Sequence, residues 1–130
     1  MLLITAAMLI LLCSFAGAED LQKDVITTSE GDLEITFIGH GSLMMRFAGK
    51  VIHIDPLSQV ADYRRLPKAD LILITHDHRD HFDPEAIRAI TKEGTTFVLT
   101  GRCAESLGKG IVMKNGDVKQ IMGITIEAVP

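Results

Sequence analysis

The alternation of apolar and polar residues predicts a strand at the start of the folded region. Apolar side chains stand at every second position, with polar side chains between them, as in a strand with one buried face. The alternating residues are Leu33, Glu34, Ile35, Thr36 and Phe37. Apolar runs follow at residues 43–47 and 51–54, and the Ala-Gly-Lys segment between them predicts a hairpin turn. The domain therefore begins with three short strands in antiparallel order.

A buried strand and a helix are predicted in the middle of the chain. Residues 71–74, Leu-Ile-Leu-Ile, form an apolar run that is too short for a helix and is typical of a strand covered on both faces. Asp83 and Pro84 supply a helix N-cap and a first-turn proline, which predicts a helix over residues 84–92. The other predicted elements are a strand at 96–99, a short helix at 102–107, a turn at Asn115-Gly116 and a strand segment at 121–129.

The N-terminal 18 residues carry no charged side chain and end in Ala16-Gly17-Ala18. An apolar core followed by a small-x-small triplet predicts a signal peptide over residues 1–18 and a secreted or periplasmic protein. An uncleaved membrane anchor is the alternative, and it is the one way in which we expect the chain to contact a membrane. Residues 19–31 are polar and irregular and predict a linker. The domain then covers residues 32–130.

Composition and charge narrow the classes of function. The chain has 130 residues, of which 47% are hydrophobic and 23% charged, as in an ordinary globular domain. Its formal net charge is −4 and it contains no run of Lys or Arg, so we expect a small-molecule substrate and no nucleic-acid partner. Cys13 lies in the predicted signal peptide, which leaves Cys103 as a single thiol and excludes a disulfide framework. Cys103 is predicted to be a small buried residue, with a reactive thiol as the alternative.

The candidate chemistry is concentrated in residues 75–81, directly after the predicted buried strand. This segment, Thr-His-Asp-His-Arg-Asp-His, holds three of the five histidines of the chain. Side chains two apart in extended backbone project to the same side, so His76 and His78 can converge on one metal ion. Asp80 and His81 follow as the chain turns, and they can reach a second ion. Two ions about 3.5–4 Å apart would activate a shared water for hydrolysis. A structural or regulatory metal site is the alternative.

The His-x-His-x-Asp-His pattern of residues 76–81 after an apolar strand resembles the signature of the metallo-β-lactamase-fold superfamily. Residues 35–42, with their Gly-His-Gly-Ser end, and residues 51–56, with their Asp-Pro end, are similar to the branch that contains ascorbate-phosphate lactonase-like hydrolases. The resemblance covers most of the chain after the predicted signal peptide.

The resemblance implies a role for each residue of the motif. His76 and His78 would bind the first metal, and Asp80 and His81 the second. Asp80 would also orient the attacking water and is therefore the predicted catalytic residue. Asp55 corresponds to the aspartate at the end of a family strand, which supports the metal loop through hydrogen bonds without binding metal. A turn-forming Asp before Pro is the alternative.

Two histidines outside the motif have separate interpretations. His40 lies in a Gly-flanked turn and is interpreted as a supporting residue at the rim of the pocket, with a surface residue as the alternative. His53 lies within a predicted strand, beside Ile52 and Ile54, and is predicted to be structural.

The resemblance also implies an α/β fold, the four-layered αββα sandwich in which two similar halves press their sheets together. Residues 32–130 would form the first half of it, a mixed sheet with helices on one face. The family's remaining ligands come from the second half, and no histidine follows His81. We therefore expect a fragment or a truncated gene product. Its uncovered sheet face would lead it to aggregate, to form a homodimer, or to bind a C-terminal complement.

These features predict a secreted metal-dependent hydrolase that uses a metal-activated water on an ester-like bond, in a lactone or a phosphate ester. We expect the isolated chain to be inactive. Zinc is the leading cofactor, with two ions in the complete protein, and manganese or iron also suits imidazole and carboxylate ligands. One alternative is a non-catalytic secreted half-fold that binds metal or dimerises, and a non-functional gene remnant is another.

Overall fold

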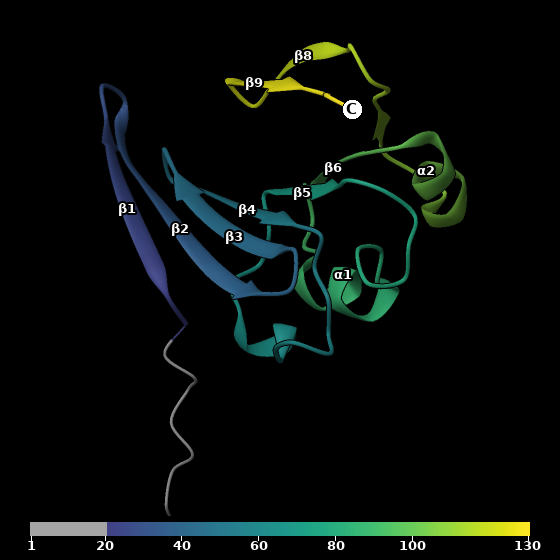
Figure 1. Cartoon of the computed structure of the whole chain (residues 1–130), viewed down its shortest axis with the longest axis horizontal. Helices are drawn as coiled ribbons and strands as arrows, with labels where there is room; N and C mark the ends of the chain where they lie inside the picture. Colours follow the sequence, from purple (N-terminus) through teal and green to yellow (C-terminus); the bar gives the residue numbers. More distant parts are fainter. Residues whose placement is uncertain (1–20) are drawn as a thin grey trace, which may run out of the picture.

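The computed structural model of the chain describes residues 21–130 (Figure 1). Within this described part, seven strands form the main sheet in the order of the sequence, and two more form a separate hairpin. The strands are β1 (Lys23–Thr28), β2 (Gly31–Gly39), β3 (Ser42–Phe47), β4 (Lys50–Ile54), β5 (Leu71–Ile74), β6 (Thr96–Leu99), β7 (Ile111–Val112), β8 (Val118–Ile121) and β9 (Ile124–Glu127). The helices are the 3-10 turn η1 (Tyr63–Arg65), α1 (Pro84–Ile90) and α2 (Gly101–Leu107). The signal peptide predicted for residues 1–18 lies outside the described residues.

The main sheet is antiparallel in its first part and parallel in its second. Strands β1 to β4 pair antiparallel, whereas β4 to β7 pair in parallel. Parallel strands need crossover connections, and α1 and α2 lie in the connections from β5 to β6 and from β6 to β7. Three of the four residues of β5 are buried, as expected for a strand covered on both faces. The predicted α/β fold with a mixed sheet is confirmed.

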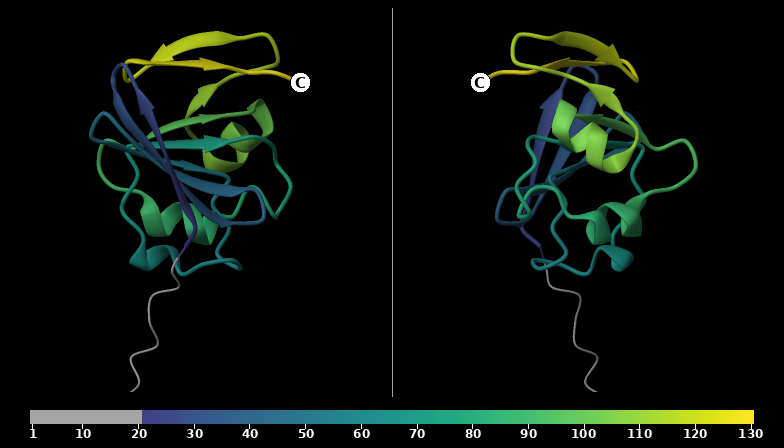
Figure 2. Two further views of the ribbon diagram at one scale, coloured as in Figure 1. Left: turned by 60° about the vertical axis from the view of Figure 1, so that its left-hand side comes forward. Right: turned by 90° about the vertical axis from the view of Figure 1, so that its right-hand side faces the viewer.

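The helices cover one face of the main sheet, and the β8–β9 hairpin crosses the other face (Figure 2). The core on the helix side joins Ile72 of β5 to Ile87 of α1 and Cys103 of α2. The core on the hairpin side joins Leu71 of β5 to Ile121 of β8. The prediction of helices on one face is confirmed. Over residues 21–130, no helix combines the length and the apolarity needed to span a membrane.

Strand β1 corrects the prediction that residues 19–31 form an irregular linker. Residues 23–28 pair antiparallel with β2 in an unbroken register. Five of the six β1 residues are exposed, so backbone hydrogen bonds hold the strand and no buried side can impose an alternating pattern. Thr28 supports the turn that follows, because its hydroxyl donates to the Gly31 carbonyl at 2.6 Å. Gly31 adopts a φ of 112°, which favours glycine.

The β8–β9 hairpin corrects the prediction of one strand segment over residues 121–129. The chain reverses between Ile121 and Ile124, which pair with each other. Met122 and Gly123 occupy the turn with φ values of 56° and 82°. A two-residue loop with positive φ at both positions matches the twist of the flanking strands. The alternation of Ile124 and Ile126 therefore belongs to the second strand of a hairpin.

The parallel pairing of β4 and β5 positions the candidate site. Ile54 at the end of β4 pairs with Leu73 near the end of β5, so both strands end at the same edge of the sheet. Asp55 and Thr75 are the first residues beyond these two ends, and the Asp55 backbone N–H donates to the Leu73 carbonyl at 3.0 Å. Two polar side chains that are far apart in the sequence therefore leave the sheet side by side.

Candidate metal centre

The loop from Thr75 to Asp83 carries the histidine motif from the end of β5 to the start of α1. A tight turn shapes it, because the backbone N–H groups of His81 and Phe82 both donate to the His78 carbonyl, at 2.9 and 2.8 Å. Asp83 then caps α1, since its carboxylate accepts a hydrogen bond from the Glu85 backbone N–H at 2.9 Å. The turn brings Asp80 and His81 back toward the end of β5.

The loop is also fixed to the connection that follows β4. The Asp83 carboxylate accepts a hydrogen bond from the Ser58 backbone N–H at 2.8 Å and another from the Ser58 hydroxyl. Partial burial acts to raise the pKa of Asp83, but the hydrogen bonds from Ser58 and from the α1 N-terminus outweigh it and lower the pKa. Asp83 is therefore ionised at neutral pH and joins α1, the metal loop and the β4–η1 connection.

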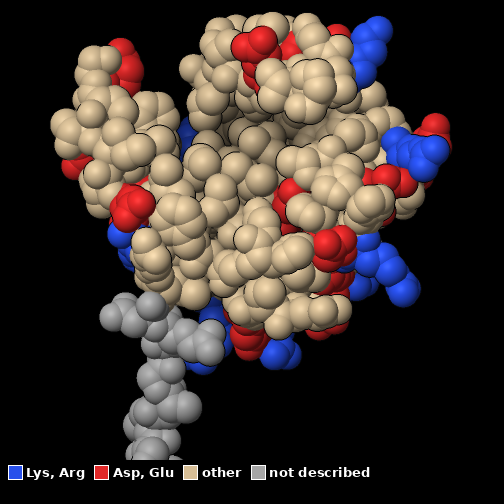
Figure 3. Space-filling model, in the orientation of Figure 1, with Lys and Arg blue, Asp and Glu red and all other residues tan. Residues whose placement is uncertain are grey.

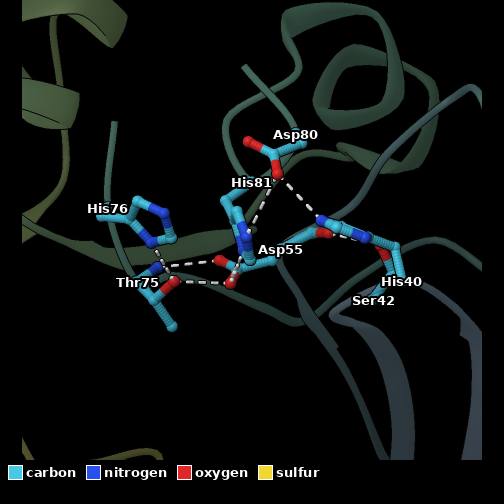
Figure 4. A network of polar contacts seen from close by, with 7 residues as sticks. All are labelled: His40, Ser42, Asp55, Thr75, His76, Asp80 and His81. Carbon is cyan, nitrogen blue, oxygen red and sulfur yellow. Dashed lines mark hydrogen bonds and ion pairs between the residues drawn. The ribbon is translucent and has the colours of Figure 1, made fainter. Parts of the chain in front are cut away.

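Asp55 is the buried carboxylate at the centre of the cluster (Figure 4). Only 3% of the residue is exposed, and its φ of 44° turns the backbone sharply at the end of β4. One carboxylate oxygen accepts from the Thr75 backbone N–H at 2.8 Å, and the other accepts from the Thr75 hydroxyl. The second oxygen also lies 2.8 Å from Nδ1 of His81. Asp55 therefore fixes both the start of the loop and the orientation of the His81 ring.

The contact with Asp55 determines which His81 nitrogen is available. A carboxylate only accepts hydrogen bonds, so Nδ1 of His81 carries the proton in this contact. In the neutral ring, Nε2 then keeps its lone pair, and it lies 3.6 Å from Oδ2 of Asp80. A histidine whose far nitrogen donates to a carboxylate is the usual form of a metal-binding histidine.

His40 reaches the cluster from the turn between β2 and β3. Its Nε2 lies 2.9 Å from Oδ2 of Asp80, and its ring centroid is 5.2 Å from that of His81. The hydrogen bond from His40 is the main reason why the pKa of Asp80 is lowered, so Asp80 is a carboxylate at neutral pH. Figure 4 shows the Asp80 carboxylate above the His81 ring, with dashed lines to His81 and to His40.

Two groups of described side chains have ligand atoms within 4.8 Å of one another, namely His40, Asp80 and His81, and Asp55, His76 and His81. Each group combines one carboxylate with two imidazoles. The buried Asp55 oxygens already accept hydrogen bonds from Thr75 and His81, whereas the exposed Asp80 carboxylate contacts the two imidazoles of its own group. Such a mixture of imidazole and carboxylate suits zinc, manganese or iron. The residues therefore fit a divalent metal ion.

The remaining motif histidines lie on the other side of His81. The His76 ring centroid is 4.1 Å from that of His81, and Nδ1 of His76 is 2.9 Å from the Thr75 hydroxyl oxygen. The His78 ring centroid is 4.6 Å from that of His76, but His78 belongs to neither group of converging ligand atoms. The structure thus brings His76, Asp80 and His81 together with Asp55 and His40, and it leaves His78 at the margin.

Three hydroxyl residues of the site, Thr75, Ser42 and Ser58, have no predicted role in the sequence. Thr75 binds Asp55 through both its backbone and its hydroxyl, and the buried Ser42 hydroxyl donates to the Asp55 carbonyl at 2.6 Å. Their positions in the sequence were the available signal, because Thr75 directly follows β5, Ser58 lies in the connection after β4 and Ser42 ends the Gly-His-Gly-Ser turn. Hydroxyl residues at strand ends are common in turns, so this signal is weak.

His53 and Cys103 lie outside the cluster. His53 is fully buried, and its Nε2 lies 3.0 Å from the Pro67 carbonyl. Burial lowers the pKa of His53 from 6.5 to about 4, so the ring is neutral at pH 7. Cys103 is buried and unpaired among the described residues, and burial raises the pKa of its thiol. Both residues therefore pack in the core on the helix side.

The fold and the histidine–aspartate cluster define the class of metallo-β-lactamase-fold proteins. The chain belongs to the family of the Beta-lactamase superfamily domain, whose sequence model matches residues 34–130. The superfamily resemblance of the motif is thereby confirmed.

Several relatives are named as metal-dependent hydrolases. A UPF0173 metal-dependent hydrolase from Thermodesulfovibrio yellowstonii is 40% identical over 96 residues, which are 68% of this chain and 34% of the relative. The crystal structure of a protein from Parabacteroides distasonis, also named for metal-dependent hydrolysis, superposes with a TM-score of 0.82 at 48% identity. A metallo hydrolase from Ignicoccus hospitalis superposes with a TM-score of 0.57 at 26% identity, over 68% of this chain and 42% of that one.

The chain spans only part of these relatives. The match to the Parabacteroides protein covers 85% of this chain but 51% of that protein. The family is thus one of metal-dependent hydrolases.

Proposed function

We propose that the chain is the metal-binding half of a secreted or periplasmic hydrolase that acts on a small ester-like substrate, a lactone or a phosphate ester. The family resemblance assigns His76, His78, Asp80 and His81 to two metal ions, and of these His76, Asp80 and His81 have converging donor atoms. The observation that carries the proposal is the convergence of imidazole and carboxylate donors beyond the ends of β4 and β5. Ligand sites of open sheets commonly lie beyond the carboxyl ends of parallel strands.

The chemistry divides between the metal and the side chains. A bound divalent ion would act as a Lewis acid and would activate a water molecule for attack on the substrate. Asp80 is ionised because its pKa is lowered, so it can accept a hydrogen bond from that water and orient it. Asp55 keeps the proton of His81 on Nδ1, which leaves the opposite nitrogen free to bind metal.

Zinc is the proposed metal because it binds imidazole and carboxylate ligands in hydrolytic sites of this kind. Manganese and iron are the other candidates, since the same ligands suit them. Metal content of the purified chain, measured after separate loading with each ion, distinguishes the three.

The hydrolase proposal is tested by reconstitution. The chain, loaded with Zn²⁺, is mixed with the part of the Parabacteroides protein that its match leaves uncovered, and hydrolysis of a lactone and of a phosphodiester is measured. We expect turnover that EDTA abolishes and Zn²⁺ restores. We expect Asp80→Asn to lower the rate at least ~100-fold. Asp77→Asn is the matched control, because Asp77 lies in the same loop but in neither group of ligand atoms.

Exposed apolar side chains such as Val25, Ile26 and Val118 favour one competing function, a non-catalytic secreted half-fold protein that binds metal or dimerises. In that case the chain and the reconstituted mixture bind metal, but neither hydrolyses the lactone or the phosphodiester. Metal-loaded mixtures without turnover would therefore replace the hydrolase proposal by the binding proposal.

A further inference from the structure

We propose that His40 binds the same metal ion as Asp80 and His81, so that three ligands of one ion come from this chain alone. The inference rests on the proposed function in one respect, because it assumes that the cluster holds metal. It adds to the motif a ligand from a separate part of the sequence, the turn between β2 and β3, and it replaces the interpretation of His40 as a supporting residue.

The spacing of the donor atoms supports a shared ion. Oδ2 of Asp80 lies 2.9 Å from Nε2 of His40 and 3.6 Å from Nε2 of His81. Ligand atoms that each lie about 2.0–2.2 Å from one ion are roughly 3–3.5 Å apart. The three side chains therefore already stand close to the separations that a common ion requires.

The orientation of the His81 ring also supports a shared ion. Because its Nδ1 is engaged by the buried Asp55 carboxylate, Nε2 is the nitrogen that faces Asp80. Two imidazole nitrogens, of His40 and His81, thus lie near one oxygen of Asp80. The Asp55 carboxylate holds the His81 ring from its other nitrogen. This is the usual construction of a metal site, in which outer hydrogen bonds orient the ligands.

The β2–β3 turn is built to approach the metal loop. His40 adopts a φ of 53°, a conformation that residues with side chains rarely adopt without support. A side-chain carbon placed on Gly41 would lie 3.0 Å from Cε1 of His81, so a side chain there would press on the His81 ring. The buried Ser42 hydroxyl then ties the turn to the Asp55 carbonyl at 2.6 Å. These contacts hold the β2–β3 turn, which carries His40, close to the metal loop.

The competing interpretation is that His40 only donates a hydrogen bond that orients Asp80. The two interpretations differ for His40→Asn, because asparagine keeps a hydrogen-bond donor near the same place but removes the imidazole. A positioning role predicts that His40→Asn rescues metal binding relative to His40→Ala. A ligand role predicts that both variants lose it.

The experiment is a Zn²⁺ titration of the full chain by calorimetry, combined with ¹⁵N NMR of the histidine rings. We expect His40→Ala and His40→Asn each to weaken Zn²⁺ binding at least ~10-fold. Asp77→Asn should bind as the unaltered chain does. In the unaltered chain, Zn²⁺ should shift the Nε2 resonance of His40 together with that of His81. The NMR measurement needs no variant, so a variant that fails to fold leaves the test intact.

Three results would overturn the inference: His40→Asn that binds Zn²⁺ with unchanged affinity, an Nε2 resonance of His40 that Zn²⁺ does not move, or no Zn²⁺ binding by the unaltered chain. The first two leave the hydrolase proposal standing. Conversely, Zn²⁺ binding through His40 without turnover in the reconstituted mixture removes the hydrolase proposal and leaves this inference in place.

Discussion

Asp55 is the residue on which the geometry of the cluster depends most. Its buried carboxylate accepts three hydrogen bonds, two from Thr75 and one from His81. Asp55→Asn keeps the size but turns one acceptor oxygen into a donor. We expect it to weaken Zn²⁺ binding about 10–100-fold and to lower the free energy of unfolding by about 1–3 kcal/mol. Calorimetry and urea denaturation measure the two effects, and Thr75→Ser, which keeps the hydroxyl, is the control. Unchanged affinity in Asp55→Asn would remove Asp55 from the site.

His53 predicts a pH dependence of stability that is independent of the metal cluster. Its pKa is about 4 in the folded chain, against 6.5 as the ordinary value, because the ring is buried. Between these two values the unfolded chain binds the extra proton, so the free energy of unfolding falls as the pH drops from 6.5 toward 4. The slope from this one group is at most about 1.4 kcal/mol per pH unit.

The measurement is urea denaturation at several pH values for the unaltered chain and for His53→Gln, which has no titrating ring. The difference in unfolding free energy between the two proteins should shift in favour of His53→Gln as the pH falls from 6.5 to 4. A difference that does not change with pH would show that His53 is not buried as a neutral ring.

At the scale of elements, the start of α1 connects helix stability to the metal loop. Asp83→Ala removes the N-cap of α1 and both hydrogen bonds from Ser58. A lost cap costs about 0.5–2 kcal/mol, so we expect a lower unfolding free energy and weaker Zn²⁺ binding. Thr100→Ala at the start of α2 is the matched control, because the Thr100 side chain makes no cap hydrogen bond. Equal losses in the two variants would contradict this role of Asp83.

Elements with a strong local signal were predictable from the sequence. The β5 run is buried and short, and α1 has both a cap and a first-turn proline, so each pattern has one physical explanation. Strand β1 was missed because five of its six residues are exposed and its pairing depends on backbone atoms, which carry no sequence pattern. The β8–β9 turn was missed because Met122 at positive φ has no turn signal of its own.

The site likewise contains residues that the local sequence predicts and a contact that depends on the fold. The motif itself is local, so His76, Asp80 and His81 could be found from their spacing. The contact of His40 with Asp80 joins residues 40 positions apart. Only the antiparallel pairing of β2 with β3 and the parallel pairing of β4 with β5 bring these two loops together. Spacing along the sequence therefore does not predict this contact.

At the scale of the whole molecule, the helices cover one face of the main sheet and the β8–β9 hairpin covers the other. The face seen in Figure 3 has few charged side chains at its centre, with Lys, Arg, Asp and Glu gathered around its rim. Several large apolar side chains are exposed, namely Val25, Ile26, Phe37, Ile111, Val112, Val118, Met122 and Val129. Association would remove some of this apolar area from water.

We therefore expect the purified chain to form homodimers or larger species at micromolar concentration, unless a C-terminal complement covers the exposed surface. Sedimentation velocity measures the size distribution. Phe37→Ser, which removes an aromatic side chain that is 39% exposed, should shift the distribution toward monomer. A stable monomer of the unaltered chain over the whole concentration range would contradict the expectation.

The central claim is that the motif loop exists to hold metal, and anomalous X-ray diffraction tests it most directly. Crystals of the chain grown with Zn²⁺ are measured on both sides of the zinc absorption edge. The account predicts an anomalous peak about 2.0–2.2 Å from donor atoms of Asp80 and His81. An anomalous map without a peak at this cluster, from crystals in which Zn²⁺ is present at saturating concentration, would contradict it.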